Sequence, residues 1–226
     1  MRRSAYALLL AASCALSGCG VGVSAHPLPA ATALREAKAH LDGTSGLHMV
    51  IDSQNVPDSA EALVSADGML SRAPAFSGAV TANLPHFGRG TVKVVAINGI
   101  LYADVFGWMR IDPATYGIPD PAQLLDPHTG VSALLVRTHG VTVGHAERGG
   151  PRNDQIITTY TGTLDGTDVA RLLPGAVGTF SAAYTIDGSG VLQGAVLKGE
   201  FDPPAVSTYV ITLDQYGATP QISAPS

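Results

Sequence analysis

The sequence predicts an α+β domain built on an antiparallel sheet, and two observations predict it. Segments in which apolar and polar residues alternate recur along most of the chain, as in strands with one buried face. Segments with helical character are few and are confined to residues 29–41, 121–138 and 165–173. Runs of strands with segregated helices are typical of α+β folds with antiparallel sheets.

Residues 1–18 are expected to be a lipoprotein signal peptide. Two arginines precede an apolar run from Ala5 to Leu16, which is too short to cross a bilayer as a helix. The run ends in Leu16-Ser-Gly-Cys19, a small-residue cleavage site followed by a thiol that can be alkylated. We therefore expect Cys19 to carry the lipid anchor, including palmitate, and residues 19–28 to form a tether. An ordinary secretory signal with an incidental Cys is the alternative.

The charge of the expected mature chain limits its partners. Removing 18 of the 226 residues would leave 208, which suits one domain. Cys14 would leave with the signal, so no disulfide within the chain is expected. Without Arg2 and Arg3, 11 basic residues face 18 acidic residues, a net charge of −7. Nucleic acid is therefore not expected as a partner, and membrane attachment is expected through Cys19 rather than through charge.

The first half of the chain is expected to contain one helix followed by a strand meander. Leu34, Ala37 and Leu41 fall at helical spacing within 29–41. Strands are expected at 46–53, 61–66, 77–84, 89–97 and 100–105, with a two-residue hairpin turn at Asn98-Gly99. The apolar residues that alternate to one face of these strands are Leu47, Met49, Ile51, Val80, Ala82, Leu84, Val92 and Val94.

Asp-Pro steps mark the central stretch, which follows Trp108, the only Trp. Asp120-Pro121 and Asp126-Pro127 each predict a helix start, because Asp can accept from free N–H groups and Pro needs no donor at the first helical position. We expect one turn at 121–125 and a longer helix at 127–138. Beyond it we expect strands at 141–147, 155–163, 179–186, 191–200 and 205–216, a short helix at 165–173, and a loose tail at 218–226.

No catalytic or metal-binding residue is predicted. The segments Gly43-Thr-Ser-Gly46 and Asp187-Gly-Ser-Gly190 lack the Gly-x-Ser-x-Gly spacing of a serine nucleophile and are typical of turns. The seven His residues include no His-x-x-x-His pair, and no Gly-rich phosphate loop joins a strand to a helix. Capping and turns explain the Asp-Pro carboxylates. We therefore expect neither enzymatic activity nor a cofactor.

The apolar composition leaves two kinds of interior open. Hydrophobic residues make up 46% of the chain and charged residues 14%, while Phe and Trp together number only six. A sheet face of small and medium apolar side chains can enclose a void that holds hydrocarbon, or it can pack into a solid core. Composition alone does not decide between them.

The central stretch resembles the mycobacterial LppX/LprG lipoprotein family, which includes LprA and LprF. The segments that carry the resemblance are Gly99-Ile-Leu-Tyr-Ala103, Trp108, and Asp120-Pro-Ala-Gln-Leu-Leu-Asp-Pro-His-Thr-Gly130. The signal ending at Cys19 and His48-Met49-Val50 fit as well, and the resemblance extends over nearly the whole mature chain. It implies a half-open antiparallel β-barrel in residues 29–217, with helices on its concave face and a hydrophobic cavity between them.

The resemblance also implies a function. Family members hold acylated glycolipids such as phosphatidylinositol mannosides and lipoarabinomannan, or phthiocerol esters, and carry or transfer them. For this chain we expect a multi-acyl envelope lipid as ligand, a membrane lipid exporter as a candidate partner, and a place on the outer face of the cytoplasmic membrane. The alternatives are an interaction lipoprotein with a solid core and an envelope hydrolase acting on lipids. The expected cavity lining is the set of alternating residues named above together with Leu124, Leu134 and Leu135.

Overall fold

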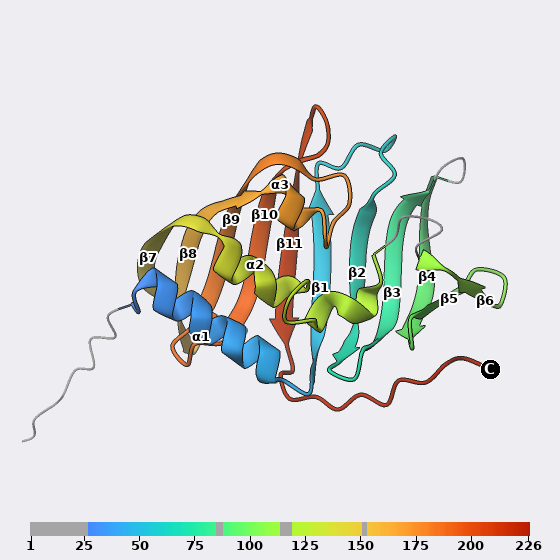
Figure 1. The fold of residues 1–226 in the computed structure, drawn as a ribbon, viewed down its shortest axis with the longest axis horizontal. Helices are drawn as coiled ribbons and strands as arrows, with labels where there is room; N and C mark the ends of the chain where they lie inside the picture. Colours follow the sequence, from blue (N-terminus) through green and yellow to red (C-terminus); the bar gives the residue numbers. More distant parts are fainter. Residues whose placement is uncertain (1–26, 85–87, 114–118, 151–152) are drawn as a thin grey trace, which may run out of the picture.

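The fold is one curved antiparallel sheet that does not close into a barrel. The computed structural model describes residues 27–84, 88–113, 119–150 and 153–226. Eleven strands follow the order β6-β5-β4-β3-β2-β1-β11-β10-β9-β8-β7, so that β6 and β7 are the two free edges of the described sheet (Figure 1). This confirms the half-open antiparallel fold.

The first meander forms one side of the sheet. Each of the five strands expected here is present, and the second is longer than expected. Asn98 and Gly99 both have positive φ, 56° and 72°, as a two-residue hairpin turn requires. The sixth strand was not predicted. The bounds are β1 Gly46–Gln54, β2 Leu63–Ser71, β3 Ala75–Leu84, β4 Gly88–Ile97, β5 Ile100–Asp104 and β6 Trp108–Ile111.

The second meander forms the other side, and β11 pairs with β1 to join the two meanders. The edge strand β7 is irregular, because its pairing with β8 shifts register twice, between His139 and Thr142 and between Val143 and Ala146. The bounds are β7 His139–Gly149, β8 Gln155–Asp165, β9 Val177–Asp187, β10 Leu192–Asp202 and β11 Ala205–Asp214.

The helices lie in front of one face of the sheet (Figure 1). They are α1 Ala30–Gly43, the 3-10 helix η2 Pro121–Leu125, α2 Val131–Arg137 and α3 Gly166–Val169. Helix α1 contacts β7, β10 and α2, and α3 contacts β8 and β9. Among the described helices, η2 is the one that chiefly contacts β2, β3 and β4. Most of the helical layer therefore covers the second meander.

The two Asp-Pro steps have different outcomes. Asp120 caps η2 as predicted, accepting from the Ala122 N–H at 2.9 Å. The helix expected from residue 127 begins only at Val131, so that prediction was wrong at its start. Asp126 instead accepts from the N–H groups of His128 and Thr129, which close a separate turn and lower the pKa of its carboxyl. The helix expected at 165–173 is likewise shorter, at Gly166–Val169.

Candidate functional site

The helix-covered face of the sheet is continuous and apolar. Directly opposed residues of antiparallel strands point to the same face, so the pairing register identifies the members of that face. One row runs across six strands of the first meander. A second row crosses both meanders. The first is Leu47, Leu70, Phe76, Ala96, Leu101 and Ile111, and the second is Val92, Val80, Ala66, Ile51, Ile211, Ala195, Tyr184 and Tyr160.

The expected lining residues of β1, β3 and β4 whose side chains are described lie on this face, and those of η2 and α2 lie in the helical layer that packs against it. Leu47, Met49 and Ile51 of β1 are buried, as is Val94 of β4. Val80 and Ala82 of β3 and Val92 of β4 are partly exposed, as is Leu124 of η2. Leu134 and Leu135 of α2 are 1% and 0% exposed. Leu84 ends β3, and its side chain lies outside the described part.

The part of this face on β8 to β11 and β1, under α1, α2 and α3, is here called the covered part, and its described side chains are closely packed. Tyr184 and Leu197 are 0% exposed, and so is Leu135 of α2. A side chain that lines a void large enough for water keeps accessible surface, so no such void touches these three. The rings of Phe180, Phe201 and Tyr209 stack edge to face, with centroids 4.7 and 4.5 Å apart.

The sequence prediction missed the side chains that fill the covered part. Phe180, Ala182, Tyr184 and Ile186 alternate along β9 in the same way as Leu47, Met49 and Ile51 along β1. The same alternation test applied to the second meander would have found them.

A second part of the same face stays accessible above η2. We call it the apolar strip and define it as Leu63, Ala66, Val80, Ala82, Val92 and Leu124, all partly exposed. The neighbouring positions on this face include glycines, which carry no side chain. A Cβ added at Gly68 or at Gly78 would lie 2.7 or 2.8 Å from the Phe76 ring tip, so this ring lies across the glycine pair. The strip itself consists of Val, Ala and Leu side chains and has no ring.

Arg72, in the turn between β2 and β3, ties the helical layer to the first meander. Its guanidinium donates to the carbonyl oxygens of Leu41 and Thr44 at the end of α1 and of Leu125 at the end of η2. These are helix carbonyls without a partner in the next turn, and a cation complements the negative end of a helix. One side chain thus joins two helices and the sheet.

A family model described as LppX_LprAFG lipoprotein matches residues 29–221. The chain belongs to the LppX_LprAFG lipoprotein family. The crystal structure of LprF from Mycobacterium bovis is similar to it with a TM-score of 0.71 and 20% identity, covering 87% of this chain and 97% of that one. The crystal structure of LppX from Mycobacterium tuberculosis is similar with a TM-score of 0.61 and 21% identity, covering 86% and 98%. No curated protein matches.

Membership in the LppX_LprAFG family makes the chain an envelope-associated lipoprotein whose family binds lipids. Cys19 and the expected signal peptide, residues 1–18, lie outside the described residues. Along the described part of the chain, no helix is both long and apolar enough to span a bilayer. Nor do three or more His, Cys, Asp or Glu side chains come together there in a way that could hold a metal ion.

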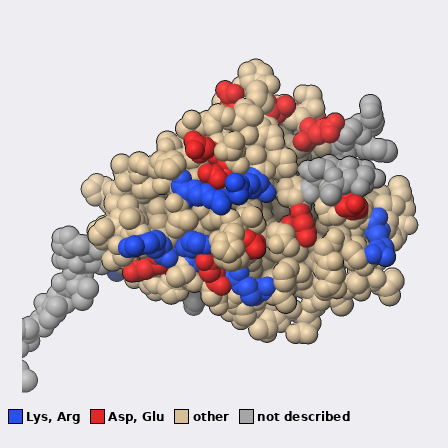
Figure 2. Space-filling model, viewed as in Figure 1, with Lys and Arg blue, Asp and Glu red and all other residues tan. Residues whose placement is uncertain are grey.

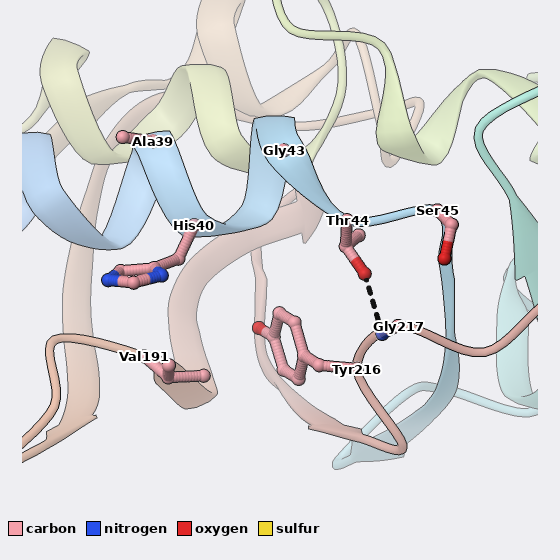
Figure 3. Close-up of a pocket in the computed structure, with 8 residues that line it drawn as sticks. All are labelled: Ala39, His40, Gly43, Thr44, Ser45, Val191, Tyr216 and Gly217. Carbon is pink, nitrogen blue, oxygen red and sulfur yellow. Dashed lines mark hydrogen bonds between the residues drawn. The ribbon is translucent and has the colours of Figure 1, made fainter.

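Two pockets on this LppX_LprAFG domain lie at the lower ends of the strands. The first, of about 460 Å³, lies below the end of α1, where His40 and Tyr216 line it and the Gly217 N–H donates to Thr44 Oγ1 at 2.9 Å (Figure 3). Tyr216 already donates its hydroxyl proton to the Leu192 carbonyl, and burial raises its pKa. The second, of about 450 Å³, lies between the β2–β3 turn and tail residues 220–222. Both pockets lie outside the apolar strip.

Several charged side chains in the helical layer of the LppX_LprAFG domain pair with groups of opposite charge. Lys and Arg side chains form rows over the helices with Asp or Glu beside them (Figure 2). Asp168 lies 3.4 Å from Arg137 and 3.8 Å from Arg171. Lys38 donates to Asp42 at 2.8 Å and to the Pro127 carbonyl at 2.6 Å, which joins α1 to the turn before α2. These pairs join neighbouring elements of the helical layer.

His48 lies on the opposite, convex face between two carboxylates. Its Nδ1 is 2.8 Å from Asp214 on β11, and its Nε2 is 2.8 Å from Asp67 on β2. A doubly protonated imidazole donates to both, and these hydrogen bonds to Asp67 and Asp214 raise the pKa of His48. Through these two hydrogen bonds His48 links β2 and β11 across β1.

Proposed function

We propose that this LppX_LprAFG lipoprotein binds the acyl chains of an envelope lipid on the apolar strip and carries or transfers them. The observation that carries the proposal is an apolar face that continues from the buried rows of β1 into partly exposed residues on β2, β3 and β4. Each methylene removed from water gains about 0.8 kcal/mol. Two or three long chains would therefore bind firmly without specific polar contacts.

The lining in this proposal combines the strip with the side chains next to it. Val80, Ala82, Val92 and Leu124 offer accessible surface at once. Leu47, Met49, Ile51, Val94, Leu134 and Leu135 are buried, so they would contact lipid only if the helical layer moves away from the sheet. A multi-acyl glycolipid would then place its headgroup outside the apolar face, and a membrane exporter would receive or supply it. In this proposal the Cys19 anchor keeps the carrier at the outer face of the cytoplasmic membrane.

Val80→Trp tests the strip directly. The indole should occupy the space between Ala66 and Val92, the residues paired with Val80 on either side, and reduce the bound lipid at least fivefold. The measurement is native mass spectrometry with lipid extraction, on the chain from Gly20 onward produced in a mycobacterial host. The matched control is Thr81→Trp, which puts the same ring on the opposite face of the same strand. Equal lipid loading in both folded variants would exclude the strip.

A second candidate function follows from the close packing of the covered part, which favours an interaction lipoprotein with a solid core. The two functions differ in ligand uptake. A carrier displaces a fluorescent fatty acid saturably, whereas a solid core gives no saturable binding. If the purified chain carries no lipid and also takes up none in vitro, the interaction function replaces the carrier function.

A further inference from the structure

The connection between β5 and β6 is the most apolar exposed segment of the described chain. Phe106 is 100% exposed, and Val105, Trp108 and Met109 are 46, 38 and 47% exposed. Single exposed apolar residues are ordinary on protein surfaces, but four within five positions form a patch. This hairpin, Asp104 to Met109, projects beyond the other strands at one end of the sheet (Figure 1).

The hairpin has a defined conformation. Asp104 pairs with Trp108 across the two strands, and the Gly107 N–H donates to Asp104 Oδ1 at 3.2 Å. Gly107 has a φ of 112°, which a residue with a side chain rarely adopts. The Phe106 side chain contributes nothing to the core, since all of its surface is accessible. The structure therefore presents this ring outward at a fixed place.

The composition of the hairpin fits a lipid bilayer better than a protein partner. A standard protein interface buries about 800 Å² on each side, which is more than four side chains supply. A bilayer needs no such area or shape complementarity, and Trp, Tyr and Arg are the residues that gather at its interface. Arg110 pairs with Tyr102 and lies two positions from Trp108, so these three side chains share one face.

We propose that the β5–β6 hairpin is a membrane-contact element that inserts Val105, Phe106 and Trp108 into the interface of a phospholipid bilayer. The proposal rests on the proposed function in one respect, since a lipid carrier must meet a bilayer. The expected tether leaves from α1, which contacts β7 at the opposite end of the sheet. Measured along the curved sheet, eleven strands spaced about 4.8 Å apart put roughly 50 Å between its two edges. Anchor and hairpin would thus hold opposite ends of one sheet, with the apolar strip on the hairpin side.

The single Trp of the chain makes the test direct, because Trp108 lies in the hairpin and intrinsic fluorescence reports on it alone. The sample is the unlipidated chain from Gly20 onward, which contains every core residue from Ala30 to Tyr216. It is titrated with phosphatidylcholine vesicles, with and without brominated acyl chains. We expect a blue shift of the emission and quenching by the brominated chains.

The variant Val105→Ser/Phe106→Ser should reduce the vesicle partition coefficient at least tenfold, because two exposed apolar side chains are lost. The matched control Val177→Ser/Val206→Ser removes two other exposed valines, 44 and 46% accessible, and should bind as the parent does. Trp108 emission that is unaffected by vesicles, or equal partition of both double variants, overturns the proposal. A concentration-dependent blue shift without vesicles, together with a dimer in sedimentation, also overturns it and assigns the hairpin to self-association.

Lipid loading is measured on the same samples, so the two proposals fail separately. If the hairpin variant still carries lipid but no longer partitions into vesicles, the result supports the hairpin as a contact element. A parent chain that carries no lipid and takes up none in vitro, yet shows quenched Trp108, overturns the carrier function and leaves the membrane contact standing.

Discussion

The covered part and the apolar strip belong to one face of one sheet, yet they are filled differently. The covered part has large rings, among them Tyr160, Phe180 and Tyr184, and helices pack on it directly. The strip has Val, Ala and Leu side chains beside the glycines Gly68 and Gly78, and η2 is the described helix that chiefly contacts its strands. Side-chain size and helix coverage change together across β1. The accessible apolar surface therefore lies where both the rings and the main helices are missing from the described structure.

Shortening an apolar side chain in the covered part and one in the apolar strip should show the largest difference in unfolding free energy. Leu135→Ala should lower the free energy of unfolding by about 4 kcal/mol, because a fully buried side chain leaves a cavity. Val80→Ala should cost only about 1 kcal/mol, because its side chain is partly accessible already. Urea unfolding measures both values. Equal losses would show that the strip is as tightly packed as the covered part and would break the comparison.

The Arg72 contact tests how the helical layer is held to the first meander. Arg72→Ala should cost about 2.5 kcal/mol, because it removes charged donors to three helix-end carbonyls. Hydrogen exchange should rise first at the end of α1 and in η2, while the β9–β10 amides stay protected. Arg72→Lys keeps the charge but not the fork of donors, so an intermediate loss is expected. A uniform rise in exchange would contradict a local attachment.

His48 should give the smallest effect, at about 1 kcal/mol or less, because Asp67 and Asp214 are largely exposed. Its raised pKa means that its stabilisation is fully present below the unfolded value near 6.5 and is lost as pH rises through the folded pKa. The difference in unfolding free energy between the parent and His48→Gln should therefore shrink with rising pH. The hydrogen bonds of His48 to Asp67 and Asp214 join β2 to β11 across β1. Their loss should therefore loosen the boundary between the covered part and the apolar strip.

Local patterns predicted most of the sheet, and their failures have physical causes. The side of the sheet to which Leu47, Val80 and Val92 point could be predicted from alternation. The pairing of β1 with β11 and of β3 with β4 contains no bulge that would reverse it. Strand β6 was missed because its four residues are too few to show alternation. The helix start at 127 was wrong because Asp126 and Gly130 close a turn first: the Gly130 N–H donates to the Asp126 carbonyl at 2.8 Å.

The interior could not be predicted from composition, because a count of rings over the whole chain hides their distribution. Five of the rings on this face, Tyr160, Phe180, Tyr184, Phe201 and Tyr209, lie on β8 to β11, whereas Phe76 is the one in the described rows of β1 to β4. Which residues meet depends on strand order, and the pairing of β11 with β1 joins segments some 160 positions apart. No local pattern encodes that contact.

The two register shifts in β7 have a consequence for how the chain behaves at high concentration. An open sheet offers backbone donors and acceptors at both edges, and a long straight edge is a template for stacking copies into fibrils. The edge at β6 is only four residues long. The edge at β7 is 11 residues long, but the shifts near Thr142 and Ala146 twist it away from a straight ladder. The irregular strand is thus a poor template for stacking copies, a protection that a closed barrel has because it has no edge at all.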